Sequence, residues 1–375
     1  MKVILVGDLH INNNKQYTSN SDSYHEVFHV FDMIKERVRN DNAELLIFLG
    51  DIFDSPSNIT TSSLTIVSKL FGELSKLIPI ITIVGNHDDV DCKTSDIQIG
   101  EVKYSIRTTV LSFLENYPNI KVVNKPEVIR MTENVEIAFI PYSNNIEADI
   151  KLVNKKFSKG SKKILMGHFE LKQPYHTIKL SQNISPNLVS AKDLANKYKY
   201  DAVYLGHIHD IGDFSTDNCI IKYLGSCRNI DFRNTGISKG IYTLNLDSLE
   251  LEFYENTQTS VYKICRSYSE LVEYCKSADK VLLNRTKLQY VYTNHSEIKQ
   301  ALKIKQFVKS IQFIKNVIGI NTSVTNDKKL QEFSRLMLNN LVNKDNLLSY
   351  AIDFKTPPNT EIASNVFKYS NRNGV

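Results

Sequence analysis

The chain has 375 residues, 42% of them hydrophobic and 23% charged, with 19 Tyr and 17 Phe. This composition is typical of a folded globular protein and excludes a mainly disordered chain, and the length favours two or three domains of roughly 100–200 residues each. The net charge is only +5, but residues 259–375 hold 18 Lys and Arg against 9 Asp and Glu, whereas residues 1–258 carry a net charge of −4.

Residues 1–258 alternate apolar runs with amphipathic stretches, which predicts an α/β core. Helices are expected near residues 25–39 and 62–77, where apolar side chains recur at helical spacing. From about residue 200 the predicted strands follow one another closely, which favours a mixed sheet. The predicted strands cover residues 3–6, 45–49, 80–84, 137–140, 164–166, 202–205, 220–224, 241–246 and 251–254.

A smaller unit of strands and helices is expected after residue 258. Strands are predicted at residues 287–292 and 310–314, with a helix at 297–304 between them. Two helices are expected within residues 327–351, and the tail from residue 357 is polar. The basic charge of this last third favours a polyanion or an acidic partner, although lysines on solvated helix faces explain it as well.

The five cysteines form no CxxC pair and no regular framework, which argues for a reducing compartment and against disulfides or a thiolate zinc site. The apolar stretch at residues 3–6 is too short for a signal peptide, and no stretch resembles a membrane span. The sequence therefore predicts a cytoplasmic or nucleoid-associated protein that does not contact a membrane. Its many Asn, Lys and Ile residues favour an AT-rich genome such as that of a phage.

Five of the predicted strands end at a glycine that is followed by a carboxylate, an amide or an imidazole. A glycine allows a tight turn, and the strand ends of an α/β sheet are where ligands bind. Five of the nine histidines lie in these turns. The five segments are Gly7-Asp8-Leu9-His10, Gly50-Asp51-Ile52-Phe53-Asp54, Gly85-Asn86-His87-Asp88, Gly167-His168 and Gly206-His207-Ile208-His209.

These residue types indicate a metal site. Hard oxygen donors mixed with imidazoles, without thiolates, suit Mn²⁺ or a similar ion. Two such ions roughly 3.5–4 Å apart hydrolyse phosphate esters, because they activate a water and neutralise charge on the phosphate oxygens. Taken singly, a D-x-H triplet is common on surfaces and G-D is common in turns. The occurrence of all five segments in this order favours one dinuclear site over unrelated structural turns.

The ordered set D-x-H, G-D, G-N-H-D, G-H and G-H-x-H resembles the calcineurin-like metallophosphoesterase superfamily over about residues 1–230. The resemblance implies an α/β protein with a four-layer α/β/β/α sandwich and two metal ions. By position, it implies that His87 touches the scissile phosphate and acts as general acid for the leaving oxygen. The implied metal ligands are Asp8, His10 and His209 for one ion, Asn86, His168 and His207 for the other, and Asp51 as the bridge.

Asp54 is the next candidate for a catalytic role. In many members of the superfamily the aspartate at this place orients the histidine of G-N-H, and a carboxylate there holds the tautomer of the imidazole. The archaeal and eukaryotic double-strand-break nucleases usually have a histidine at this place, whereas the SbcD-like proteins of bacteria and phages have an aspartate, as here. An ordinary turn carboxylate explains Asp54 equally well.

Other segments resemble the nucleases of the superfamily more than its protein phosphatases. Residues 50–56 lack the arginine of the phosphatase motif G-D-x-V-D-R-G, and Asp88 stands where the phosphatases have glutamate. Residues 167–171 resemble the corresponding turn of phage recombination nucleases. Residues 223–228 and 239–242 are similar to the segment Y-x-G-S … K-G that closes the catalytic domain of SbcD-type nucleases, although Cys227 replaces a more usual small residue or proline.

The SbcD-type resemblance also implies the domain organisation. It implies a metallophosphoesterase domain at residues 1–258, a small β/α capping domain that contacts DNA at 259–322, a C-terminal helical pair at 323–356 and a polar tail at 357–375. The helical pair docks on an SMC-like, SbcC-type ATPase in such complexes, and the phosphoesterase domain forms a homodimer. The candidate DNA contacts are Arg228, Arg233, Lys303 and Lys305, although surface salt bridges explain these cations as well.

The leading hypothesis is therefore a DNA exonuclease and endonuclease that depends on two Mn²⁺ ions, within an SbcCD-type recombination and double-strand-break processing complex. Mg²⁺ or another divalent first-row metal is an alternative cofactor. The second hypothesis is a small-molecule (nucleotide) phosphodiesterase or phosphatase of the same superfamily. A third is a non-enzymatic scaffold, against which the intact ligand set argues.

Overall fold

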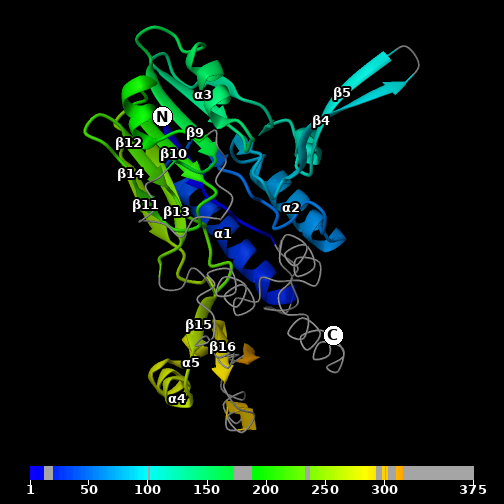
Figure 1. Cartoon of the computed structure of the whole chain (residues 1–375), viewed down its shortest axis with the longest axis vertical. Coiled ribbons are helices and arrows are strands. Elements are labelled where there is room, and N and C mark those ends of the chain that lie inside the picture. Colours follow the sequence, from blue (N-terminus) through cyan, green and yellow to red (C-terminus); the bar gives the residue numbers. More distant parts are fainter. Residues whose placement is uncertain are drawn as a thin grey trace, which may run out of the picture.

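The structure, a computed structural model, describes residues 1–11, 20–99, 102–172, 188–232, 237–292, 298–299, 301–302 and 310–315. Its body contains two stacked six-stranded sheets with helices on both outer faces (Figure 1). A smaller three-stranded sheet with its own helices follows the body in the chain. Within the described part of the chain, no helix is both long and apolar enough to cross a membrane.

The first sheet is built from Lys2–Val6 (β1), Leu45–Phe48 (β2), Ile80–Ile83 (β3), Ile120–Val123 (β6), Gly240–Asn245 (β13) and Leu251–Glu255 (β14). Its strand order is β14-β13-β1-β2-β3-β6. The strands β1, β2, β3 and β6 run parallel, whereas β13 is antiparallel to both of its neighbours. The strands β1, β2 and β3 are buried and almost wholly apolar because both faces of the sheet are covered.

The second sheet is built from Glu127–Arg130 (β7), Val135–Ile140 (β8), Lys162–His168 (β9), Ala202–Gly206 (β10), Gly212–Asp213 (β11) and Ile220–Tyr223 (β12). Its strand order is β11-β12-β10-β9-β8-β7. The four central strands run parallel, and the edge strands β7 and β11 are antiparallel to their neighbours. Each sheet therefore has a parallel core whose strands end at one edge.

Three apolar clusters fix the order of the layers. One cluster lies between the sheets and joins residues such as Ile47 of the first sheet to Phe139 and Met166 of the second. Another packs the first sheet against α1 (Asn20–Asn40) and α2 (Thr61–Leu74), and a third packs the second sheet against α3 (Ile146–Asn154) and the short π-helical turn η2 (Asp193–Lys197). The body is a four-layer α/β/β/α sandwich.

A two-stranded hairpin projects from the sandwich (Figure 1). It consists of β4 (Asp89–Ile99) and β5 (Val102–Thr109), and the 3₁₀ turn η1 (Ser112–Asn116) leads the chain back to β6. The hairpin begins directly after the segment that follows β3.

The small unit is a parallel sheet of β15 (Val261–Cys265), β16 (Thr286–Tyr292) and β17 (Ser310–Lys315). The helices α4 (Tyr268–Ser277) and α5 (Lys280–Arg285) connect its first two strands. Leu271 of α4 packs with Leu288 and Tyr290 of β16 in a core of its own, which is separate from the three clusters of the body.

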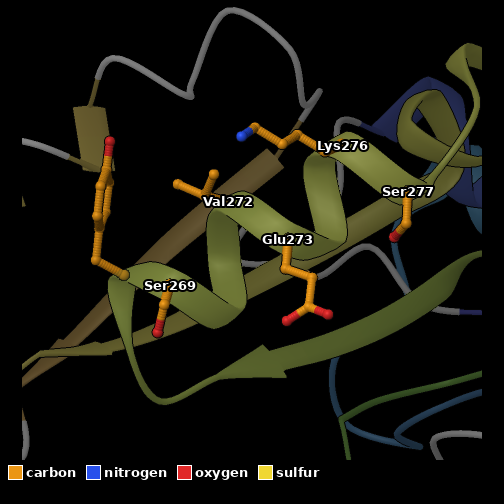
Figure 2. A pocket seen from close by; sticks show the side chains of 6 residues that line it. Ser269, Val272, Glu273, Lys276 and Ser277 are labelled. Carbon is orange, nitrogen blue, oxygen red and sulfur yellow. The ribbon is translucent and has the colours of Figure 1, made fainter.

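A hollow of about 570 Å³ lies along α4. Figure 2 shows Val272 and Lys276 on one side of the helix and Ser269, Glu273 and Ser277 on the other, and these residues form two adjacent rows at a spacing of four. Because the whole lining comes from one helix and includes none of the motif residues, this hollow is not the candidate active site.

The predicted α/β sandwich is confirmed. All nine strands predicted in the first 258 residues are present, with boundaries that differ by two residues at most, and both predicted helices occur. The prediction from the sequence did not include the strands β4, β5, β6, β7, β11 and β15 or the helices α3, α4 and α5. The expected helix at 297–304 and the pair at 323–356 lie largely or wholly outside the described residues, and the domain boundaries remain predictions.

Phe71 is the most informative position for a test of the outer layer. Its ring is fully buried between α2 and the first sheet, with its centroid 4.9 Å from that of Phe48 and 5.6 Å from that of Phe31. We expect Phe71→Ala to lower the free energy of unfolding by about 3–5 kcal/mol, because it leaves a cavity among aromatic rings. Leu64→Ala on the same helix should cost below about 1 kcal/mol, since Leu64 is 40% exposed. Equal losses in urea denaturation would contradict this packing.

Candidate metal centre

Five motif segments meet at one edge of the sandwich. In the first sheet β1, β2 and β3 are parallel neighbours, so the segments that begin at Gly7, Gly50 and Gly85 leave the sheet side by side. In the second sheet β9 and β10 are parallel neighbours and deliver His168 and the segment after Gly206. Side chains from the two sheets contact one another across this edge.

The first ligand cluster consists of Asp8, His10 and His209. One ligand atom of each lies within 4.8 Å of the other two. The Nε2 atoms of His10 and His209 are 3.0 Å apart, and their rings meet edge to face. Asp8 and His10 are almost completely buried. Residues that follow β1 and β10 therefore form one cation-sized group of donors.

The second ligand cluster consists of Asp51, Asn86, His168 and His207. The ligand atoms of Asp51, His168 and His207 again lie within 4.8 Å of one another. The side-chain oxygen of Asn86 lies 3.0 Å from His168 Nε2 and 2.8 Å from His207 Nδ1. The two imidazoles and the amide oxygen thus converge, together with one carboxylate, from both sheets.

The carboxylate of Asp51 lies between the two clusters. Its Oδ2 atom is 3.4 Å from His10 Nε2 of the first cluster and 3.2 Å from His168 Nε2 of the second. Its Oδ1 atom accepts a hydrogen bond of 2.8 Å from the backbone N–H of His87. All seven side chains expected to bind metal are therefore brought together, with Asp51 where a bridge is expected.

Two glycines allow this close approach. A Cβ atom on Gly85 would lie 2.1 Å from Asp51 Oδ1, and one on Gly50 would lie 2.3 Å from His168 Nδ1. Gly50 also has φ of +104°, a backbone conformation that side chains strongly disfavour. Neither position tolerates even a methyl group without displacement of a cluster residue.

Backbone and carboxylate oxygens orient the histidines. His168 Nδ1 donates a hydrogen bond of 2.7 Å to the carbonyl of Leu49, so its Nε2 atom is the one that faces Asp51 and Asn86. The Asp54 carboxylate lies 3.3 Å from His10 Nδ1, which leaves His10 Nε2 to face the clusters. Such partners hold the tautomer and the ring orientation of a metal ligand.

The expected contact between the Asp54 carboxylate and His87 is wrong for this structure. His87 Nδ1 instead donates to the backbone carbonyl of Asp54, at 2.5 Å, while the carboxylate turns toward His10. In the turn after β2, the backbone carbonyl of Asp54 faces His87, whereas its carboxylate faces His10 in the segment after β1. Asp54 still orients His87, but through its main chain.

Asp88 organises the turns of the first sheet, a role that sequence analysis did not assign. This buried carboxylate accepts hydrogen bonds from the backbone N–H groups of Ile52, Phe53 and Gly85. It therefore ties the segment after β2 to the segment after β3. Burial and the charge of Asp51 raise the pKa of Asp88 to about 7. A charged residue directly after a buried strand was the available signal.

The buried groups shift one another's pKa values. Burial alone would lower the pKa of His168, but the carboxylates of Asp51 and Asp8 raise it to about 9. Burial and the charge of His168 lower the pKa of His207 to about 3. Although burial opposes it, the charges of His168 and His10 hold the pKa of Asp51 below its usual range. The metal-free protein at pH 7 thus holds a cationic His168 beside an ionised Asp51.

The donor set fits divalent cations. Asp8 Oδ2 is buried and accepts no hydrogen bond within the described part of the chain, which is costly for a carboxylate oxygen unless a cation faces it. Oxygen and imidazole donors without thiolates match Mn²⁺ and related ions. The residues present therefore fit a dinuclear centre.

The expectation that Arg228 contacts DNA is not supported. Arg228 is 3% exposed, and its guanidinium donates to the carbonyls of Leu9 and His10 and lies 3.5 Å from Glu26. A buried guanidinium that contacts three internal acceptors does not reach a DNA backbone. The other candidate DNA contacts, Arg233, Lys303 and Lys305, lie outside the described residues.

Two stacked, largely parallel sheets with paired clusters of Asp, Asn and His at their strand ends define a metal-dependent phosphoester hydrolase. The chain belongs to the calcineurin-like phosphoesterase family, whose sequence model matches residues 1–210. This match confirms the predicted family and the predicted class of enzyme.

Individual relatives are more distant. The chain is 23% identical over 265 residues to the SbcD component of the nuclease SbcCD of Staphylococcus epidermidis, an alignment that covers 67% of each chain. It is 25% identical over 284 residues to the DNA double-strand break repair protein Mre11 of Methanococcus maripaludis, covering 72% of this chain and 68% of that protein. Among solved structures, a dimetal phosphatase from Danio rerio is 11% identical with a TM-score of 0.41, covering 66% of this chain and 92% of that chain.

The raised pKa of His168 predicts that metal binding releases a proton. Below pH 9 the free imidazole carries a proton on Nε2, the atom that faces Asp51, and a metal ion on that nitrogen must displace it. The apparent Mn²⁺ affinity should therefore rise by up to about tenfold per pH unit between pH 6 and 8. Titration calorimetry in buffers of different ionisation enthalpy should give about one proton released from this group. Heats that do not depend on the buffer would contradict the protonation of His168.

Proposed function

We propose that this chain is a two-metal phosphodiesterase that hydrolyses DNA, as the nuclease component of an SbcCD-type complex. One observation carries the proposal: the strand ends of two sheets bring seven oxygen and nitrogen donors into two clusters with one carboxylate between them. This arrangement suits two cations that act together on one phosphate.

The proposed ligands follow the two clusters. Asp8, His10 and His209 would hold one ion, while Asn86, His168 and His207 would hold the other, with Asp51 shared. When bound, two divalent ions, Mn²⁺ in this proposal, neutralise charge on the phosphate oxygens and activate water for attack on phosphorus. Mg²⁺ has the same charge and remains the main competitor.

His87 is the proposed general acid. Its backbone N–H donates to Asp51, which places the residue beside the clusters, and its ring lies edge to face with His10 at a centroid distance of 4.9 Å. Because the Asp54 carbonyl accepts the hydrogen bond from Nδ1, Nε2 is the nitrogen left to exchange a proton with substrate. A proton delivered from Nε2 to the leaving oxygen completes cleavage of the ester.

The choice of DNA as substrate is supported by the extent of the sequence similarity. The family model matches 210 of 375 residues, about 56%, whereas the alignments to the SbcD component and to Mre11 cover 67% and 72% of the chain. Similarity to these two relatives, one named as a nuclease and the other as a DNA double-strand break repair protein, therefore extends beyond the residues that the family model matches. The basic charge of residues 259–375 favours a polyanionic substrate as well.

The proposed partners follow from the same relatives. The Staphylococcus epidermidis relative is named as one subunit of the nuclease SbcCD, that is, as a component of a complex. We therefore propose that residues 323–356 dock on an SMC-like ATPase of the SbcC type. We also propose that the phosphoesterase domain forms a homodimer.

His87→Ala should separate acid catalysis from metal binding. Hydrolysis of DNA needs a proton on the leaving alkoxide, so the rate constant should fall by about 10²–10⁴. Hydrolysis of bis-p-nitrophenyl phosphate should fall much less, because nitrophenolate leaves without a proton. Calorimetry should still show two bound Mn²⁺ ions, whereas the ligand variant His207→Ala should lose one. Equal losses on both substrates together with loss of an ion would make His87 a ligand instead.

The substrate class can be tested directly. Purified protein in Mn²⁺ should cleave linear duplex, hairpin or single-stranded DNA, lose this activity in EDTA and regain it when Mn²⁺ is restored. The assay should be repeated with a candidate ATPase partner, because the isolated protein can be slow. Turnover of small phosphodiesters and nucleotides without any DNA cleavage, even with the partner present, would identify a nucleotide-type phosphodiesterase.

A further inference from the structure

We propose that two buried cations, Arg228 and Lys239, are positioning residues for the first ligand cluster. Neither side chain faces the cluster donors directly. Arg228 instead binds the backbone carbonyls of Leu9 and His10, and Lys239 binds that of His209. The inference rests on the proposed function, because it concerns one of the two proposed metal positions.

Arg228 holds the segment after β1. Its Nε atom donates a hydrogen bond of 2.8 Å to the carbonyl of Leu9, and a terminal nitrogen donates to the carbonyl of His10. The backbone N–H groups of Leu9 and His10 donate to the carbonyl of Asp51, at 3.0 and 2.9 Å. His10 has φ of +46°, a conformation that costs a non-glycine residue energy, so contacts on both sides are needed to hold it.

Lys239 holds the segment after β10. Its side chain is completely buried, and its Nζ atom donates to the carbonyl of His209 at 2.5 Å and lies 3.7 Å from Asp210. The same carbonyl accepts a hydrogen bond of 3.0 Å from the backbone N–H of Ser226. The hydrogen bond from this buried ammonium to the backbone carbonyl of His209 fixes the position of His209 relative to the end of β10.

Four residues, Ser226, Cys227, Arg228 and Lys239, thus contact every residue of the first cluster. The backbone N–H of Cys227 donates to the carbonyl of Asp8 at 3.3 Å, which complements the contacts to His10 and His209. We call the group formed by Ser226, Cys227, Arg228 and Lys239 the carbonyl platform. Its hydrogen bonds to Asp8, His10 and His209 go to their backbone carbonyls and leave the donor atoms of all three ligands available.

The second cluster has different supports. The Leu49 carbonyl holds His168, the Asp88 carboxylate holds the turn that begins at Gly85, and the backbone N–H of His207 donates to Asp8 at 3.0 Å. None of the hydrogen bonds described for the carbonyl platform goes to a residue of the second cluster. A change in the platform should therefore weaken one metal position far more than the other.

A general effect of buried charge is the rival explanation. Glu26 accepts from Ser260 and lies 3.5 Å from Lys287 as well as from Arg228, so loss of Arg228 does not leave this carboxylate without a cation. Lysine at position 228 would keep the charge but lose the planar fork that reaches two carbonyls. Arg228→Lys therefore tests whether the two hydrogen bonds of the guanidinium are needed or whether a positive charge alone is enough.

The test is a Mn²⁺ titration of the metal-free full chain by calorimetry. Arg228→Gln, Arg228→Lys and Lys239→Met should each weaken one of two bound ions by about 10- to 100-fold and leave the other within about threefold. The ion that each variant retains should bind with the affinity of the ion retained in His209→Ala, and not with that of the ion retained in His207→Ala. Arg37→Met is the matched control, a largely buried cation that pairs with Glu36 and Asp41 and should leave both sites unchanged. Circular dichroism of each metal-free variant checks that it folds.

Three results would overturn the proposal: equal weakening of both ions, no weakening in any platform variant, or wild-type affinity in Arg228→Lys. If Arg228→Gln does not fold, Arg228→Lys and Lys239→Met decide the question. If the wild-type chain itself fails to bind two ions, the proposed two-metal function is wrong, and so is the proposed role of the carbonyl platform. If the wild type binds two ions and the platform variants are unaffected, the platform alone is wrong.

Discussion

The carboxylate of Asp51 is the constraint on which the centre depends. Its two oxygens contact an imidazole from each sheet and a backbone N–H from the neighbouring turn, so both sheets must approach within hydrogen-bonding distance of one side chain. That approach requires the missing Cβ atoms of Gly50 and Gly85. The parallel strands of both sheets make this approach possible, because they deliver the residues that follow them to the same edge.

The same convergence creates a charge problem. Asp8, Asp51 and Asp88 are buried carboxylates, and the effective cost of burying an unpaired ion is several kcal/mol. In the metal-free chain part of this cost is relieved by protonation, since the pKa of Asp88 rises to about 7 and that of His168 to about 9. Bound divalent cations would relieve it more completely. Metal binding should thus stabilise the folded chain as well as prepare it for hydrolysis, because only the folded state presents the clusters.

The sequence predicted nine strands of the two sheets and the gathered ligands for one reason: a strand covered on both faces is mainly apolar, so the glycine and polar residues that follow it mark its end. The hairpin β4–β5 was missed because its strands contain few apolar residues and carry no such pattern. Individual side-chain contacts also could not be predicted from the sequence. A cation such as Arg228 is normally exposed, and only the fold reveals that two carbonyls and Glu26 surround it. The partner of the Asp54 carboxylate depends equally on a turn geometry that spacing does not encode.

Glu26 links the centre to the small unit. It contacts Arg228 in the body, Ser260 just before β15 and Lys287 in β16, and all four side chains are buried. A buried ionic network tolerates little displacement, because a shift of Glu26 would leave both Arg228 and Lys287 without their carboxylate. The position of the small sheet is therefore coupled, through Arg228, to the backbone of Leu9 and His10. The chemistry is fixed by the two large sheets, but a surface that engages substrate or a partner through the small unit has a short physical route to one of the two ligand clusters.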